Sequence, residues 1–484
     1  MTAQAPGKTE RDIQGRDILG RAIAVGFLLA VVFTALAHGA VEPWSVFVFE
    51  SIVLALVVIW AIKVIVDKRL AITIPKAALP IAALALVGLA QSVAFEDGAG
   101  RWTSLSKNVE ATRGAVTVLI FLLIAFIIAA NLFSTRERLV ALANFLVVYG
   151  LAMALFALVQ HFTWNGKFYW LRPNTVSISP FGPFVNHNHF SGYMEMLIAV
   201  PIALIVTRAV GREMRLMCGF AAVMMGIASV MSLSRGGMIS LAAEMIFVVF
   251  VSFSLARKRR QSAGRSGARA LFPSAASQAL AAAFIAAIII AGVFWIGADA
   301  VITRVTKGQD VSANAEKESF HSSRGWVWRD TLAMISANPL LGVGLGAYGT
   351  AFPIYSKSDG SLRVPQAHND YLQVLADCGV VGGAIALWFL VVLFRTFAAG
   401  AGSADPLLRA LALASGAGTF AILVHSVFDF NLQLPSNALL FLLLTAVASA
   451  VAALRGNENS LALRATALRK GEEVAASFVR RVSP

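Results

Sequence analysis

Two arginines and one histidine are the residues of this sequence best suited to chemistry. Arg235 lies in SLSRGGMIS (232–240), Arg324 in SSRGWVWRD (322–330) and His368 in AHNDYLQ (367–373). A guanidinium group binds phosphate oxygens through paired hydrogen bonds and stays charged, whereas an imidazole can take a proton from a hydroxyl near neutral pH. These residue types suit a reaction in which a lipid-linked diphosphate leaves a sugar, because two guanidinium groups stabilise the developing negative charge without a metal.

The composition identifies an integral membrane protein. Of the 484 residues, 58% are hydrophobic and 14% are charged, with a mean hydropathy of +0.74. These values exclude a soluble domain with a polar shell. A helix needs about 20 apolar residues to cross a bilayer, and the first apolar stretch is too long and too charged at its flanks for a cleaved signal peptide. We predict twelve spans, at approximately 18–37, 44–63, 77–94, 115–133, 139–160, 191–209, 214–232, 238–256, 278–297, 378–399, 409–428 and 436–455.

The net charge of +14 follows the predicted topology. With the N-terminus in the cytoplasm, most of the 40 Lys and Arg residues face inward, as the positive-inside rule requires. The basic character therefore reports topology, and no nucleic-acid partner is expected. We predict nine spans in 1–297, a large periplasmic loop at 298–377, three spans in 378–455 and a cytoplasmic tail at 456–484, with both termini in the cytoplasm.

The large loop is predicted to contain amphipathic helices. Trp328, Leu332 and Ile335 recur at i, i+4 and i+7, which predicts a helix that ends before Pro339, with Arg324 extending the same face.

The second predicted helix leads into the tenth span. His368, Tyr371, Leu372 and Leu375 share one face at its start. Between the two helices, the glycines of NPLLGVGLGAY (338–348) predict a turn or a close-packed connection. No strand precedes them, so a nucleotide-binding loop is rejected.

Three further outer segments carry polar residues. His187 and His189 alternate on a predicted extended chain. Two interpretations are equally good: the histidines contact a lipid headgroup or glycan, or the segment is a simple turn. A metal site would need a third ligand, which this motif does not supply. Arg235 is predicted at the outer membrane boundary, held by a tight Gly236-Gly237 turn, either in a functional role or reaching interfacial water. Asp429, between the last two spans, is expected to pair with an arginine from another loop.

The order of SLSRGG, SSRGWVWRD, NPLLGVGLGAY and AHNDYLQVLADCGVVGG resembles the O-antigen ligase and polymerase superfamily of bacterial envelope glycosyltransferases over approximately 181–390. The resemblance implies an all-α, GT-C-like membrane fold in the bacterial inner membrane, with the active site facing the periplasm. It implies transfer of a glycan from undecaprenyl diphosphate to a glycan or lipid acceptor, with no cofactor or metal. Membrane lipids and envelope polysaccharide assembly proteins are further expected partners.

The resemblance also implies roles for individual residues. Arg235 and Arg324 would hold the diphosphate, and His368 would activate the acceptor hydroxyl. Seven other residues are expected to contact the donor or acceptor: His187, His189, Trp328, Asn369, Asp370, Tyr371 and Asp429. Ligase and polymerase activities stay open, because nothing in the N-terminal third identifies the acceptor.

Two other classes of function remain as alternatives. The first is a transporter of a small anion or saccharide, since Glu50, Glu195 and Glu244 lie in or near apolar spans. Against it, the distinctive polar residues gather on one side and not at the midplane, where transport sites usually lie. The second alternative is a membrane scaffold for an envelope assembly machine.

Overall fold

A computed structural model describes residues 10–96, 98–174, 180–262, 324–357 and 363–482. Within these residues, ten helices are long and apolar enough to cross a membrane. They confirm an all-α polytopic membrane protein. The predicted span at 278–297 and the first part of the large loop, 298–323, lie outside the described residues.

The ten helices are α1 (Glu10–Leu36), α2 (Pro43–Asp67), α4 (Val109–Leu132), α5 (Arg136–Phe162), α6 (His187–Val206), α7 (Arg212–Met231), α8 (Arg235–Ser262), α13 (Asp370–Ala401), α14 (Pro406–His425) and α15 (Pro435–Val482). The shorter helices are α3 (Ala78–Gln91), α11 (Gly325–Ala337), α12 (Tyr348–Tyr355) and the 3-10 turn η2 (Asn431–Gln433). Two small antiparallel hairpins pair β1 (Ala94–Glu96) with β2 (Trp102–Ser104) and β3 (Lys167–Phe168) with β4 (Arg172–Pro173).

The third predicted span, at 77–94, is too long. Helix α3 has 14 residues, which at 1.5 Å per residue is about 21 Å and falls short of the roughly 30 Å of hydrocarbon. The helix stops at Gln91, whose amide nitrogen donates to the carbonyl oxygens of Leu341 and Asp377 at 2.6 and 2.9 Å. These bonds to a distant part of the chain fix the helix end.

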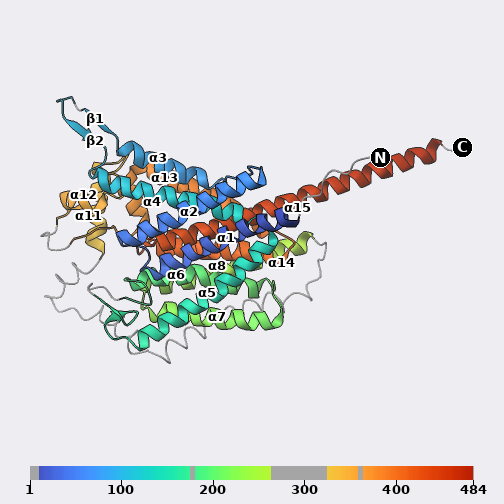
Figure 1. The fold of residues 1–484 in the computed structure, drawn as a ribbon, viewed down its shortest axis with the longest axis horizontal. Helices are drawn as coiled ribbons and strands as arrows, with labels where there is room; N and C mark the ends of the chain where they lie inside the picture. The colour runs from blue at the N-terminus through green and yellow to red at the C-terminus, as the bar shows by residue number, and fades with distance from the viewer. Residues whose placement is uncertain (1–9, 97, 175–179, 263–323, 358–362, 483–484) are drawn as a thin grey trace.

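The helices form a bundle along one long axis (Figure 1). Helices α11 and α12 and the β1–β2 hairpin lie at one end, which we call the loop end. The start of α1 and the far part of α15 lie at the other, which we call the terminal end.

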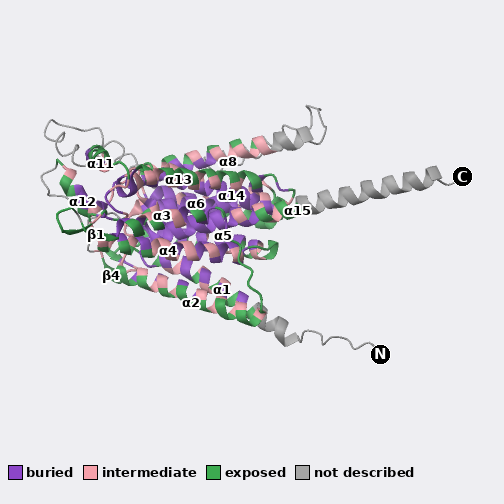
Figure 2. Ribbon diagram, turned by 90° about the horizontal axis from the view of Figure 1, so that it is seen from above, coloured by how far each residue is buried: buried purple, intermediate pink, exposed green. Residues whose placement is uncertain are grey.

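Helix α6 is the centre of the bundle. Ninety-four per cent of its most apolar window is buried, against 22% for α2 at the periphery (Figure 2). Gly418 lets α14 approach α6 closely, because a Cβ atom there would lie 3.1 Å from the Cα of Met196. Small residues at such contacts are the usual means of close helix packing in membranes. The first turn of α6 therefore occupies a fixed, enclosed position at the loop end.

The glycine-rich connection after α11 is close-packed, as the sequence predicts. Gly342, Gly344 and Gly346 have φ values of +69°, +114° and +75°, and the connection donates backbone hydrogen bonds from Val343 and Gly344 to α13. Helix α13 is itself interrupted at Gly379, where φ is +61°. The segment before this kink belongs to the loop end and the segment after it spans the bundle.

We expect Gly342→Ala and Gly379→Ala each to destabilise the protein. Added Cβ atoms would lie 2.4 Å from the Asp377 carbonyl carbon and 2.3 Å from the Leu340 carbonyl oxygen, and the left-handed backbone adds about 1–3 kcal/mol of strain. Thermal unfolding in detergent should show a lower Tm for both variants. The control is Gly114→Ala in α4, which meets nothing within 4 Å; equal Tm values for all three variants would contradict the close-packed connection.

Candidate functional site

The centre of the site is Asp429, a fully buried carboxylate in the connection between α14 and α15. One oxygen, Oδ2, accepts hydrogen bonds from the Asn188 amide at 2.6 Å and from Arg324 Nη2 at 3.2 Å. The other, Oδ1, lies 3.3 Å from His368 Nδ1 and accepts the backbone N–H of Phe430 at 2.9 Å. Three groups far apart in sequence thus meet on one carboxylate.

Asp429 is ionised despite its burial. Burial alone would raise its pKa, but the imidazoles of His189 and His368 and the charge of Arg324 outweigh that effect and hold the pKa of Asp429 well below its usual range. His189 Nε2 lies 3.8 Å from Oδ1. Asp429 therefore carries its negative charge over the whole range in which a membrane enzyme is ordinarily assayed.

His368 is presented to the site by an unusual backbone, and its expected place in a helix is wrong. It lies two residues before α13 and has a φ of +50°, a conformation that costs energy in any residue with a side chain. The preceding residue, Ala367, is held from both sides: its carbonyl accepts the Trp328 indole N–H at 3.0 Å and its N–H donates to Gln373 at 2.8 Å. This anchoring fixes the strained turn.

The next three residues attach the His368 turn to α14 and its following connection. Asn369 caps α13 by accepting two backbone N–H groups and donates to the Val427 carbonyl at 3.0 Å. Asp370 accepts the Ser426 hydroxyl at 2.8 Å, and the Tyr371 hydroxyl donates to the Leu423 carbonyl at 2.8 Å. In the structure, Trp328, Asn369, Asp370 and Tyr371 thus all position the turn that carries His368.

Arg324 lies immediately before α11, and its pairing with Asp429 confirms the expected partner for that carboxylate. The predicted helix is present, but its predicted buried face is wrong. Val327, Thr331 and Met334 are buried, whereas Leu332 is 52% exposed. The true buried stripe includes polar Thr331, whose hydroxyl contacts the Tyr348 hydroxyl at 2.7 Å, and a count of apolar residues alone misses it.

Arg235 is the first residue of α8, at the loop end, and the expected Gly236-Gly237 turn is wrong. The chain turns three residues earlier, at Leu233, where φ is +60°. Both glycines belong to the helix and allow close packing: a Cβ at Gly236 would lie 3.0 Å from the His425 ring and 3.1 Å from Phe428. Arg235 therefore begins its helix against the chain that leads to Asp429, with an exposed side chain.

His187 and His189 lie in the first turn of α6, so the predicted extended chain is wrong. Asn186 caps that helix with its side chain. His189 is buried against the Phe430 ring, with centroids 4.6 Å apart, and His368 lies on the same ring at 4.9 Å. Asn188, which was not predicted as a site residue, reaches Asp429 because the helix turns it toward α14. The sequence NHNH (186–189) indicated a polar segment, but it did not show which of its side chains would reach Asp429.

A second buried ion pair lies beneath the site and was also missed. His425 Nδ1 is 3.1 Å from Glu195 Oε1, and the other Glu195 oxygen accepts the Ser240 hydroxyl at 2.5 Å. The His425 carbonyl in turn accepts the Asp429 N–H at 3.0 Å. The pair thus connects α6, α8 and α14 directly under the Asp429 connection.

The arrangement places the anchored imidazole of His368 beside the ionised carboxylate of Asp429. Arg324 binds the same carboxylate through Nη2, and its other guanidinium nitrogens do not contact it. The side chains of His368 and Arg324 are 30% and 37% exposed, so both are accessible from outside the bundle. Among the residues that the structure describes, no group of three or more His, Cys, Asp or Glu residues is placed to hold a metal ion.

Comparison with known proteins gives one family. The model of the family described as O-Antigen ligase matches residues 220–387, roughly a third of the chain. The matched segment includes Arg235, Arg324 and His368, whereas Asn188, His189 and Asp429 lie outside it. No curated protein matches this chain.

At the level of the family, the match supports an enzyme of glycan transfer of the O-antigen ligase or polymerase type. It also supports lipid-linked glycan substrates for a multi-pass membrane protein. The resemblance drawn from the sequence motifs is thereby confirmed, because residues 220–387 match the O-Antigen ligase family.

Proposed function

We propose that this protein is a membrane glycosyltransferase that moves a glycan from undecaprenyl diphosphate to an acceptor hydroxyl on the periplasmic side of the bacterial inner membrane. The observation that carries the proposal is the convergence of His368 and Arg324 on buried Asp429. This convergence combines a proton acceptor with a binder of diphosphate, which are the two functions that the reaction needs.

His368 is the proposed general base. Asp429 accepts a hydrogen bond from Nδ1–H, which leaves the lone pair of Nε2 available to the acceptor hydroxyl. As Nε2 takes the hydroxyl proton, the acceptor oxygen bonds to the anomeric carbon of the donor sugar and the bond from that carbon to the diphosphate oxygen breaks. The anionic Asp429 stabilises the imidazolium that forms, and the proton is then lost to water.

Arg324 and Arg235 are the proposed diphosphate ligands. Negative charge builds on the leaving diphosphate, and a guanidinium group that is already held in place stabilises it without reorganising. Only one Arg324 nitrogen is bonded to Asp429, so the others can bind phosphate oxygens. Arg235 starts α8 beside the same connection, where it would bind the second phosphate.

His187 is the proposed contact for sugar or acceptor at the rim, together with Trp328 near the His368 turn, whereas buried His189 is a proposed support of Asp429. The hydrogen bonds of residues 369–371 anchor the turn that carries His368. We therefore propose that these residues position the base and do not themselves bind the donor or acceptor, which refines their expected role. Ligase and polymerase differ in acceptor, and the glycans of a deletion strain distinguish them: full-length polymer left on its lipid carrier indicates a ligase, and single repeat units indicate a polymerase.

His368→Ala should reduce glycan transfer by about 100-fold or more, since a positioned general base contributes about 10²–10⁴-fold. The measurement is product formation in proteoliposomes supplied with a lipid-linked glycan. His161→Ala, at the end of α5, is the matched control and should keep full activity. Full activity in a folded His368→Ala variant would contradict the assignment of His368 as the general base. Flux of saccharide without any lipid-linked donor would favour a transporter.

Arg324→Lys should weaken donor binding by about tenfold or more. Lysine keeps the positive charge but loses the planar fork that binds phosphate oxygens in pairs. The apparent KM for the lipid-linked donor and kcat should be measured together. If both are unchanged while Arg324→Ala only lowers Tm, the arginine is a structural partner of Asp429.

Asp429→Asn should abolish most activity at every pH between about 5 and 9, because the depressed pKa of Asp429 keeps the wild-type carboxylate ionised throughout that range. The ionised carboxylate stabilises the folded protein at every pH above the ordinary pKa of Asp. This stabilisation is lost only as the pH falls through the much lower pKa of Asp429 in the folded protein. The variant should therefore be much slower than the wild type throughout that range. Wild-type rates in a folded Asp429→Asn variant at about pH 7 to 8 would contradict the role assigned to the carboxylate.

A further inference from the structure

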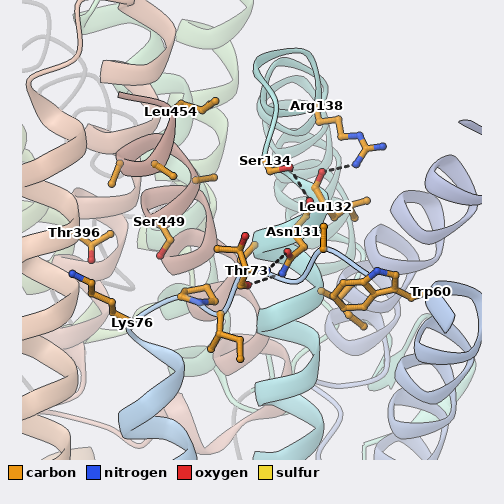
Figure 3. Close-up of a pocket in the computed structure, with 18 of the residues that line it drawn as sticks. Trp60, Thr73, Lys76, Asn131, Leu132, Ser134, Arg138, Thr396, Ser449 and Leu454 are labelled. Carbon is orange, nitrogen blue, oxygen red and sulfur yellow. Dashed lines mark hydrogen bonds between the residues drawn. The ribbon is translucent and has the colours of Figure 1, made fainter. Parts of the chain in front are cut away.

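A large cavity lies at the terminal end, and Asp429 does not line it. It has a volume of about 1090 Å³ and is enclosed by the start of α1, the ends of α2 and α4, the start of α5, and the α13 and α15 helices (Figure 3). Ligand sites usually occupy about 300–1,000 Å³. The cavity is therefore large enough for a headgroup together with part of its acyl chains.

Positive charge dominates the walls of this cavity. Five basic residues line it: Lys63, Arg69, Lys76, Arg138 and Arg395. The one acidic residue of the lining, Asp67, is paired with Lys63 at 2.5 Å. Arg138 donates to the Leu132 carbonyl at 2.9 Å and keeps its full charge. An excess of four positive charges thus faces a single enclosed space.

The segment after α2 has an exposed apolar edge beside the cavity. Leu70, Ile72 and Ile74 are 70%, 47% and 61% exposed, at alternate positions of this segment. The cavity is lined by Arg69, Ala71, Thr73 and Ile74 of the same segment. An exposed apolar row of this kind suits the hydrocarbon or interface of a bilayer, so the cavity opens where lipid is the neighbouring solvent.

This segment is fixed in place, so the cavity is preformed. Thr73 and Asn131 exchange two hydrogen bonds, from the Thr73 N–H to the Asn131 side chain and from that side chain to the Thr73 carbonyl, both at 2.8 Å. Figure 3 shows this exchange, with Lys76 reaching toward the wall that carries Thr396 and Ser449 and with Arg138 across the cavity.

We propose that this cavity binds the phosphate headgroup of an anionic membrane phospholipid, with its acyl chains along the apolar edge of residues 70–74. Several bases around one enclosed space attract a phosphodiester, and basic pockets between spanning helices are suited to anionic headgroups. An apolar approach from the bilayer favours a lipid over a soluble phosphate. This site is separate from the glycan chemistry and does not depend on it.

The test uses the purified, delipidated full chain and a variant, Lys76→Gln with Arg395→Gln. Native mass spectrometry and thermal unfolding should be followed as dioleoyl phosphatidylglycerol, dioleoyl phosphatidylcholine or inorganic phosphate is added. Phosphatidylglycerol should bind the wild type and raise its Tm, and the variant should need at least about tenfold more of it, since each base near a headgroup contributes about 1 kcal/mol. Phosphatidylcholine and inorganic phosphate should have little effect.

Two controls separate the cavity from general charge and from misfolding. Arg208→Gln with Arg212→Gln, the α6–α7 control, removes one base from the α6–α7 connection and one from the start of α7, both outside the cavity lining, and should bind like the wild type. Lys76→Arg with Arg395→Lys keeps both charges and should also retain binding. The proposal is overturned by equal phosphatidylglycerol binding in the Lys76→Gln, Arg395→Gln variant, by equal loss in the α6–α7 control, or by a Tm increase with inorganic phosphate alone.

Discussion

The buried carboxylate of Asp429 is the constraint on which the loop end of this protein depends. An ionised carboxylate without partners inside a protein costs several kcal/mol, so it must be surrounded by donors and opposite charge. Asn188, Arg324, His368 and the Phe430 N–H supply them. Because these groups come from different elements, satisfying one charge fixes the relative positions of α6, α11, the start of α13 and the α14–α15 connection.

The scaffold around Asp429 provides rigidity at two depths. Beneath it, the Glu195–His425 pair ties α6 to α14, with Ser240 of α8 completing the carboxylate contacts. Above it, the glycine-rich connection after α11 is bonded to α13 and to Gln91 of α3. A base that must lie within hydrogen-bond reach of its substrate benefits from supports of this kind, and the strained His368 backbone persists because both neighbours of the turn are anchored.

The two ends of the bundle have different physical characters. The loop end combines one buried negative charge with arginine and histidine, the residue types on which the proposed glycan transfer depends. The terminal end presents an excess of lysine and arginine around an enclosed space beside an apolar edge. Some of the basic residues that bias the charge of the chain thus line one cavity and are not dispersed in solvent.

The sequence by itself determined the membrane class, most of the spans, the helix after Arg324 and the residues that carry the family resemblance. Runs of apolar residues and ordered motifs are local properties, so they can be recognised without a structure. The length of α3, the buried face of α11, the turn at Leu233 and the non-helical His368 could not be predicted, because contacts with distant segments set each of them. Only the tertiary structure brought Asn188, Arg324 and His368 onto Asp429. Convergence on a shared charge depends on how helices pack, and no spacing along the chain records it.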